Sequence, residues 1–309
     1  MTKIYANIVY ALLWLVSLLP FRAIYLLSDL LAGLLHSVIR YRRRVVRENL
    51  ASSFPERPEK ELRKIERRFY RFLTDYALET IKLITMRPAT IKKRMRLVNI
   101  DTVNDATGRG RSVSLLLGHY CNWEWVSSIP LQLENGAIGA QIYHFLHSRV
   151  MDDVFKRIRT RFGAENIPMQ KIMRRLVEWK REGTVTVTGY IADQEPGFDV
   201  HLYLDFLNHE TAVYTGPERI SRFLDAEVYY CRLLRPRRGY YTLEFVPVTL
   251  TPKKEPVFSI TREYFRMLEE SIDAHPEYWL WSHKRWKRPR EVFYEHWGEE
   301  KAREMLTHL

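Results

Sequence analysis

Two apolar stretches open the chain, and they limit where its N-terminal part can lie. Residues 4–19 are almost wholly apolar, and residues 21–39 carry only Arg22 and Asp29 as charges. A cluster of four arginines and one tyrosine follows at residues 40–44. A helix needs about 20 apolar residues to cross a bilayer comfortably, and neither stretch reaches that length. The pattern is typical of a segment that engages a membrane without a long span.

Several structures for this segment are compatible with the sequence. An anchor that is not cleaved, or a hairpin that enters one leaflet, fits best, because the basic cluster is expected to remain cytoplasmic beside anionic head groups. A signal peptide would need a small-residue cleavage site, which only Ala32-Gly33 imitates. Two buried core helices are the remaining alternative. We predict a membrane anchor over residues 1–40 and one catalytic domain over residues 41–309.

Composition limits the partners. The 309 residues are 46% hydrophobic, enough to bury a substantial core, and Lys+Arg 49 against Asp+Glu 37 gives a net charge of +12. Such a charge favours an anionic partner, which nucleic acid, an anionic lipid surface or an acidic protein would satisfy. The chain has two cysteines, Cys121 and Cys231, and neither belongs to a C-x-x-C pair, so a disulfide framework or zinc site has no support.

Helical and strand patterns alternate along the rest of the chain. Helices are predicted at residues 40–50, 59–86, 149–162, 170–181 and 216–224, and strands at residues 112–117, 137–143, 184–191, 228–234 and 240–248. This alternation, which ends in a hairpin-like pair, predicts an α/β fold with a mixed sheet flanked by helices. The periodic apolar residues of segment 59–86 indicate packing.

The run from Gly118 to Trp125 is the best candidate for a catalytic turn. Gly118 interrupts the predicted strand at residues 112–117, and Asn122 is suited to cap a following helix. His119 and Glu124 are separated by five positions, which a strand, turn and helix can bring together although a continuous helix cannot. A histidine with a reference pKa of about 6.5 can accept a proton near neutral pH while a carboxylate fixes its tautomer. A second interpretation is a partly buried histidine, with Glu124 favouring a helix N-terminus.

A second loop is expected to reach the same place. In open α/β sheets, ligands bind beyond the carboxyl ends of the strands. His119 follows one predicted strand, and Asp193 and Gln194 follow another. The two loops are therefore predicted to open onto one cleft, where these two residues would support the histidine, the acceptor or the loop itself. A self-capped turn is the alternative for Asp193.

Several blocks in this order resemble the lipid A late acyltransferases, the lauroyl- and myristoyl-type enzymes of the wider lysophospholipid acyltransferase superfamily. The resemblance extends over most of the chain. The blocks are residues 42–50 with Phe54-Pro55, Gly118 to Glu124, Ala192-Asp193-Gln194, Thr215-Gly216-Pro217 and Trp281 to Pro289. Asn122-Trp123-Glu124 is especially similar to the family's His-x-x-Asn-Trp-Glu pattern. Position 121 is usually small in that pattern and is a cysteine here.

The resemblance implies a glycerolipid-acyltransferase-like fold and an enzyme of the inner membrane, with its catalytic domain on the cytoplasmic face. It would transfer a fatty acyl group from acyl carrier protein or acyl-CoA to a hydroxyl of a lipid A precursor, with no metal or cofactor. His119 would be the general base with Glu124 as its partner. Arg159, or Arg161 close by, would stabilise the oxyanion. Asn122, Trp123 and Gln194 would contact substrate.

Two other classes of function remain as alternatives. A metal-dependent phosphoesterase or deacetylase could use His119, Glu124 and Asp193, but the sequence offers no H-x-x-x-H or H-x-H pair beside them. A binding protein for anionic lipid or nucleic acid would account for the charge, but no nucleic-acid-binding module is apparent and nucleic acid is not expected as a partner.

Overall fold

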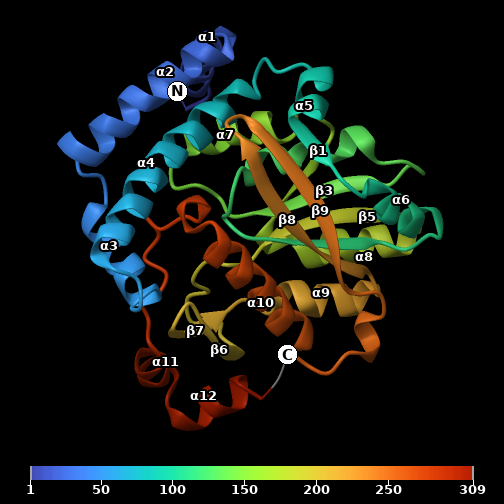
Figure 1. The fold of residues 1–309 in the computed structure, drawn as a ribbon. Coiled ribbons are helices and arrows are strands. Elements are labelled where there is room, and N and C mark those ends of the chain that lie inside the picture. The colour runs from blue at the N-terminus through green and yellow to red at the C-terminus, as the bar shows by residue number, and fades with distance from the viewer. Residues whose placement is uncertain (1, 308–309) are drawn as a thin grey trace.

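A seven-stranded sheet forms the centre of the fold, and helices cover it (Figure 1). The structure is a computed structural model that describes residues 2–307. The strand order is β1-β9-β8-β2-β5-β3-β4, and all neighbours are parallel except β8 and β9. The strands are β1 (Met95–Leu97), β2 (Val113–Leu117), β3 (Ile138–Tyr143), β4 (Glu165–Pro168), β5 (Thr186–Ile191), β8 (Glu227–Arg237) and β9 (Tyr240–Thr249). The predicted mixed α/β sheet is confirmed.

The helices occupy the segments between the strands and both ends of the chain. They are α1 (Thr2–Leu18), α2 (Phe21–Gly33), α3 (Arg43–Ser53), α4 (Glu59–Lys82), α5 (Pro88–Arg94), α6 (Ile100–Gly108), α7 (Arg149–Arg159), α8 (Ile172–Glu182), α9 (Gly216–Leu224), α10 (Ser259–Ala274), α11 (Arg290–Trp297) and α12 (Glu299–Met305). Short π and 3-10 segments include η1 (Leu34–Val38), η2 (Trp123–Gln132) and η5 (Pro276–Tyr278). A separate hairpin joins β6 (Leu202–Phe206) to β7 (His209–Val213). The predicted helices and strands are all present, with shifted ends.

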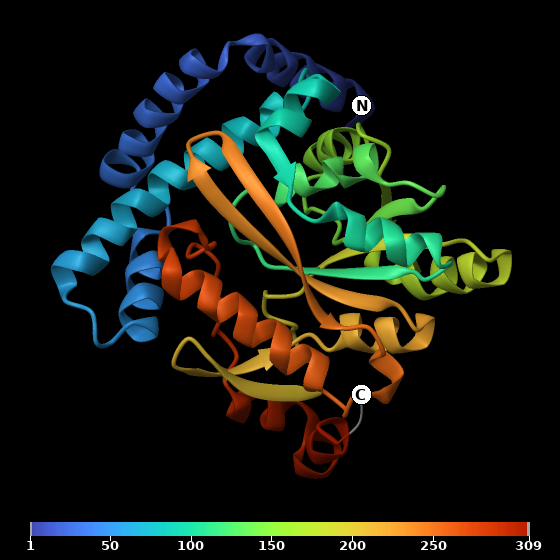
Figure 2. The ribbon, with the colours of Figure 1, turned by 45° about the vertical axis from the view of Figure 1, so that its right-hand side comes forward.

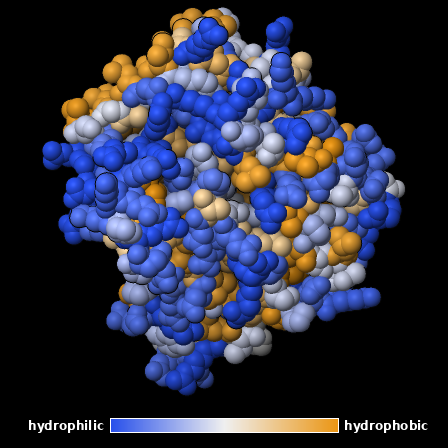
Figure 3. Space-filling model, viewed as in Figure 1, coloured by the Kyte–Doolittle hydropathy of each residue, from blue (hydrophilic) through white to orange (hydrophobic). Residues whose placement is uncertain are grey.

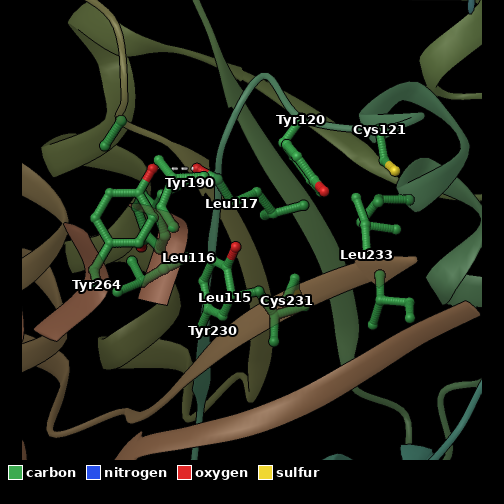
Figure 4. Packing of buried hydrophobic residues seen from close by; sticks show 14 of the residues in the cluster. Leu115, Leu116, Leu117, Tyr120, Cys121, Tyr190, Tyr230, Cys231, Leu233 and Tyr264 are labelled. Carbon is green, nitrogen blue, oxygen red and sulfur yellow. Dashed lines mark hydrogen bonds between the residues drawn. The ribbon is translucent and has the colours of Figure 1, made fainter. Parts of the chain in front are cut away.

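Strand β2 lies at the middle of the core. All five of its residues are buried, as expected for a parallel strand covered on both faces. Figure 4 shows Leu115, Leu116 and Leu117 among buried aromatic side chains, and the hydroxyl of Tyr264 on α10 donates a hydrogen bond of 2.5 Å to the carbonyl oxygen of Leu117. This contact secures the last residue of β2. The loop that follows is therefore held at a fixed place.

The two N-terminal helices form an outer layer on the rest of the chain. Helix α2 packs along α4, and α1 packs against both α4 and α7. Figures 1 and 2 both show these helices at the periphery, outside α4. Within the described residues, one helical segment, Phe21–Val38, is long and apolar enough to cross a membrane by length and composition, and 17% of it is buried. The boundary between an anchor and a catalytic domain near residue 40 stays a prediction.

Candidate active site

His119 and Asp193 meet at the carboxyl ends of two neighbouring strands. Strands β2 and β5 are parallel and in register, with Leu117 beside Ile191, so the loops after them leave the sheet at the same edge. The distance from His119 Nδ1 to Asp193 Oδ1 is 2.7 Å, and the backbone N–H of His119 donates to Asp193 Oδ2 at 2.8 Å. The prediction that the two loops open onto one site is confirmed.

Asp193 is held in its ionised form. The residue is 1% exposed, and its Oδ2 also accepts a 2.8 Å hydrogen bond from the indole N–H of Trp279. Burial by itself would raise the pKa of Asp193, but the electrostatic attraction of the His119 ring, together with the hydrogen bonds from His119 and Trp279, outweighs burial and holds this pKa below its ordinary value. A buried carboxylate at Nδ1 fixes the imidazole so that Nε2 is the nitrogen available to accept a proton. No hydrogen bond to Nε2 occurs within residues 2–307.

Glu124 is paired with Arg159 instead. The guanidinium binds the carboxylate through both of its oxygens, with Nε to Oε2 at 2.9 Å and Nη2 to Oε1 at 2.5 Å. Glu124 is 3% exposed, and the hydroxyl of Tyr76 donates to its Oε1 at 3.4 Å. Burial works against the charged form of Arg159, yet Glu124 raises the pKa of Arg159 above its ordinary value. Two-point geometry of this kind fixes both side chains.

The expectation that Glu124 orients His119 is therefore wrong. The sequence places Glu124 close to His119, but η2 directs its carboxylate to α7, while the imidazole turns to the loop after β5. Glu124 belongs to the same motif as His119, but the carboxylate that pairs with His119 is that of Asp193. Among the described residues, no hydrogen bond joins His119 to Glu124.

A cavity of about 640 Å³ connects the two pairs. His119, Glu124 and Arg159 line it, and most of the remaining wall is apolar. That wall includes Leu115, Leu117, Val126, Ile129, Pro130, Ala140, Ile142, Phe155, Ile172, Met173, Val187 and Ile191. Gly189 on β5 also lines the cavity, and a β-carbon there would lie at an ordinary contact distance of 3.5 Å from Leu117. The cavity has room and apolar lining for a flexible hydrocarbon chain.

The turn between His119 and Glu124 is held by hydrogen bonds to other segments of the chain. Cys121 has φ 52° and is fully buried, and its N–H donates to the carbonyl of Tyr278 at 3.0 Å. Asn122 caps η2 through the N–H of Trp125, as predicted, and donates to Oε2 of Glu79 at 2.7 Å. Burial raises the pKa of the Cys121 thiol, which opposes formation of a thiolate nucleophile.

The four residues expected to bind substrate or the oxyanion alongside Arg159 divide into two groups. Trp123 and Gln194 line the cavity, and Trp123 stacks on Tyr76 at a centroid distance of 4.0 Å. Asn122 is fully buried in the turn, and Arg161 is exposed and donates to the carbonyl of Met86 at 2.9 Å. Neither of these two residues lines the cavity, so the structure does not support the contacts expected for them.

Sequence reasoning missed two supporting residues. Tyr76 belongs to the periodic apolar face of α4, where its hydroxyl gave no sign of a role beside Glu124. Trp279 precedes the C-terminal Trp281 to Pro289 block by two residues, and only the fold brings it to Asp193. The one signal that the sequence offers is that Trp279 is an aromatic residue with a polar atom and lies close to a motif block.

The chain is similar to known proteins over most of its length. Residues 1–288 match the family model described as bacterial lipid A biosynthesis acyltransferase. The chain is 23% identical over 284 residues to a protein of Escherichia coli (strain K12) named lipid A biosynthesis lauroyltransferase, and the match covers 91% of this chain and 90% of that protein.

Proposed function

Because the chain belongs to the bacterial lipid A biosynthesis acyltransferase family, we propose that it transfers a fatty acyl group from a thioester to a hydroxyl of a lipid A precursor. The observation that carries the proposal is the His119–Asp193 pair at the wall of an apolar cavity. The cavity suits the acyl chain, and the pair suits removal of a proton from an alcohol. The donor is an acyl carrier protein or acyl-CoA, and the reaction occurs on the cytoplasmic face of the inner membrane.

The proposed chemical step begins at Nε2 of His119. This nitrogen takes the proton of the acceptor hydroxyl as the oxygen attacks the thioester carbonyl, and a tetrahedral oxyanion forms. The carbon–sulfur bond then breaks, and the imidazolium returns the proton to the leaving thiolate. Asp193 stabilises the imidazolium formed between the two proton transfers. The products are an ester and a free thiol.

Arg159 supplies positive charge for the oxyanion in this proposal. Its Nε and Nη2 are engaged by Glu124, and Arg159 lines the cavity, so we propose that the N–H groups not engaged by Glu124 donate to the oxyanion. A donor that is already held in place needs little rearrangement when charge develops on the thioester oxygen. Glu124 then acts through Arg159 as a positioning residue. Trp123 and Gln194 are proposed to contact the substrates from the cavity wall.

The proposal is tested with purified full-length protein, an acyl-carrier-protein or acyl-CoA thioester, and a lipid A precursor. Transfer is followed by mass spectrometry of the lipid product. We expect His119→Ala to lower the turnover by at least about 100-fold. Asp193→Asn is expected to give a similar loss, because the imidazolium loses its counter-charge. His147→Ala, a change of an exposed histidine outside the cavity lining, is the matched control.

Two results would contradict the proposal. Transfer by the His119→Ala enzyme at the rate of the parent would remove the general base. Loss of activity on treatment with a metal chelator, with recovery on addition of a divalent metal, would instead favour a metal-dependent reaction. A circular-dichroism spectrum of each variant shows whether its fold is retained.

A further inference from the structure

The outward faces of α1 and α2 are apolar although both helices are fixed to the protein. On α2 and η1, an exposed stripe repeats every four residues, at Leu26, Leu30, Leu34 and Val38, and Leu26 and Leu30 are 74% and 70% exposed. Apart from Asn7, the exposed residues among positions 4–18 of α1 are also apolar, and they include Ile4, Ile8, Leu12, Leu15 and Leu18. Figure 3 shows hydrophobic side chains gathered along this edge of the molecule, next to a strongly hydrophilic surface.

The inner face of α2 carries polar side chains that bind other parts of the chain, beside the buried apolar residues Ile24 and Ala32. Tyr25 donates to Glu79 at 2.9 Å, and Ser28 donates to Asp75 at 2.6 Å, both on α4. Asp29 accepts hydrogen bonds of 2.9 Å from Nη1 and Nη2 of Arg238, which lies in the turn between β8 and β9. These contacts hold α2 lengthwise against charged groups that would be costly to place in hydrocarbon.

Helix α1 is held in a similar way. The ammonium group of Lys82 donates to the carbonyls of Ser17 and Leu19 at 2.5 and 2.7 Å, and Arg157 on α7 donates to the side chain of Asn7 at 2.7 Å. Since α7 also contributes Phe155 and Arg159 to the cavity, α1 lies directly outside one cavity wall. A membrane that contacts α1 is therefore close to the site of the proposed reaction.

We propose that α1 and α2 lie in the plane of the membrane and bury their outer faces in one leaflet, without crossing it. The partner is an anionic phospholipid surface, because Arg22 is exposed on α2 and the exposed Arg40, Arg42 and Arg44 follow it. An amphipathic layer with an apolar outer face and flanking cations is the arrangement that such a surface binds. This inference rests on the membrane location in the proposed function and specifies how the chain is seated there.

The first test is binding of the full-length protein to vesicles of phosphatidylethanolamine and phosphatidylglycerol in equal parts. The variant Leu26→Glu/Leu30→Glu is expected to bind at least about 100-fold more weakly, because two leucines can no longer enter the leaflet. The control Leu250→Glu/Val257→Glu makes the same chemical change at two exposed apolar residues outside α1 and α2, and is expected to bind as the parent does. Equal binding by both variants would overturn the proposal.

The second test measures topology in intact spheroplasts. Pro20→Cys places a thiol in the exposed turn between α1 and α2, while Cys121 and Cys231 are buried. A membrane-impermeant maleimide should label position 20 only after lysis, and an N-terminal epitope tag should resist external protease until then. Labelling of position 20 in intact cells would show that α2, or a hairpin, crosses the membrane. Cleavage of the tag alone would show that α1 crosses.

The alternative is that the apolar face of α1 and α2 binds a second copy of the chain. In that case the parent would sediment as a dimer in the absence of lipid, the Leu26→Glu/Leu30→Glu variant would be a monomer, and vesicle binding would be unaffected. This outcome would also overturn the proposal. Neither test depends on acyl transfer, so a failed reaction assay leaves this inference standing, and a failed topology test leaves the proposed chemistry intact.

Discussion

The indole Nε1 of Trp279 lies 2.8 Å from Oδ2 of Asp193, and this contact joins the C-terminal part of the chain to the candidate catalytic pair. The same segment holds the turn after His119, because Tyr120 and Trp279 form an isolated β-bridge and the N–H of Cys121 donates to Tyr278. The orientation of His119 is therefore set by three segments that are distant in sequence: the ends of β2 and β5, and the chain after α10.

Replacement of Trp279 by phenylalanine should impair chemistry more than substrate binding. The ring that packs against Phe206 and Trp281 is largely kept, but the hydrogen bond to Asp193 is lost. A hydrogen bond to a charged group is worth about 1.5–3 kcal/mol, so kcat should fall by about 10-fold or more, with little change in KM. The pKa of Asp193 should rise, because one of the hydrogen bonds that favour its ionised form is lost.

The matched control is Trp297→Phe, which also removes one indole hydrogen bond, in that case to the carbonyl of Phe198. It should leave both kcat and KM unchanged. A kcat equal to that of the parent for Trp279→Phe as well would show that the indole only packs.

The Glu124–Arg159 pair should show strong coupling in a double-mutant cycle. Arg159→Met leaves the Glu124 carboxylate buried without its counter-charge, and loss of one partner of a buried pair costs about 3–5 kcal/mol. Arg159→Met/Glu124→Gln should recover much of the free energy of unfolding, measured in urea, but not the turnover. Equal destabilisation by the single and double variants would show that the unpaired Glu124 carboxylate is not the cause of the loss.

His283 should make the protein less stable in mild acid. Burial is the main cause that lowers the pKa of His283 from 6.5 to about 4, and it outweighs the attraction of Asp193. Because the unfolded chain binds this proton more readily, the free energy of unfolding should fall as the pH drops from about 6.5 to about 4. His283→Gln should flatten this dependence in denaturant titrations at several pH values. A slope equal to that of the parent would exclude His283 as its source.

Gly189→Val should change which acyl chains are accepted. The added side chain projects from β5 into the cavity beside Leu117 and reduces its length or width. Discrimination of about 10-fold or more is expected for each methylene that no longer fits, measured as kcat/KM for thioesters of increasing chain length. Gly33→Val, at a position with helical backbone and open space that lies outside the cavity lining, tests for a general effect, and equal losses for all chain lengths would contradict a steric role.

The sequence predicted the parts of this structure that depend on local patterns. The apolar run at β2, the Asn122 cap and the loop after β5 were all found from neighbouring residues, and the parallel sheet brought His119 to Asp193 as its topology requires. The partner of Glu124 was not predictable in the same way. Whether that carboxylate turns to His119 or to Arg159 depends on the path of η2 and on the position of α7, which local spacing does not encode.

Other elements were missed because their stability comes from tertiary contacts. β1 has three residues and exists through its pairing with β9, and the β6–β7 hairpin packs against α10. Helix α10 is a different case, because its local pattern is readable: its buried residues Ile260, Tyr264, Phe265 and Leu268 recur at helical spacing, yet the predictions above include no helix there. Trp279 likewise gains its role only when α10 returns the chain to the edge of the sheet.

Glu79 has a consequence for attempts to shorten the protein. Its carboxylate accepts hydrogen bonds from Tyr25 on α2, Asn122 in the turn and Tyr241 on β9, and it is fully buried. A protein that begins after residue 40 would lack Tyr25. The carboxylate of Glu79 would then be exposed to water, and so would Asn122, which caps η2. In such a fragment the turn from His119 to Glu124 would be held less firmly than in the intact protein. Crystallisation and screening should therefore use the intact chain in detergent or nanodiscs.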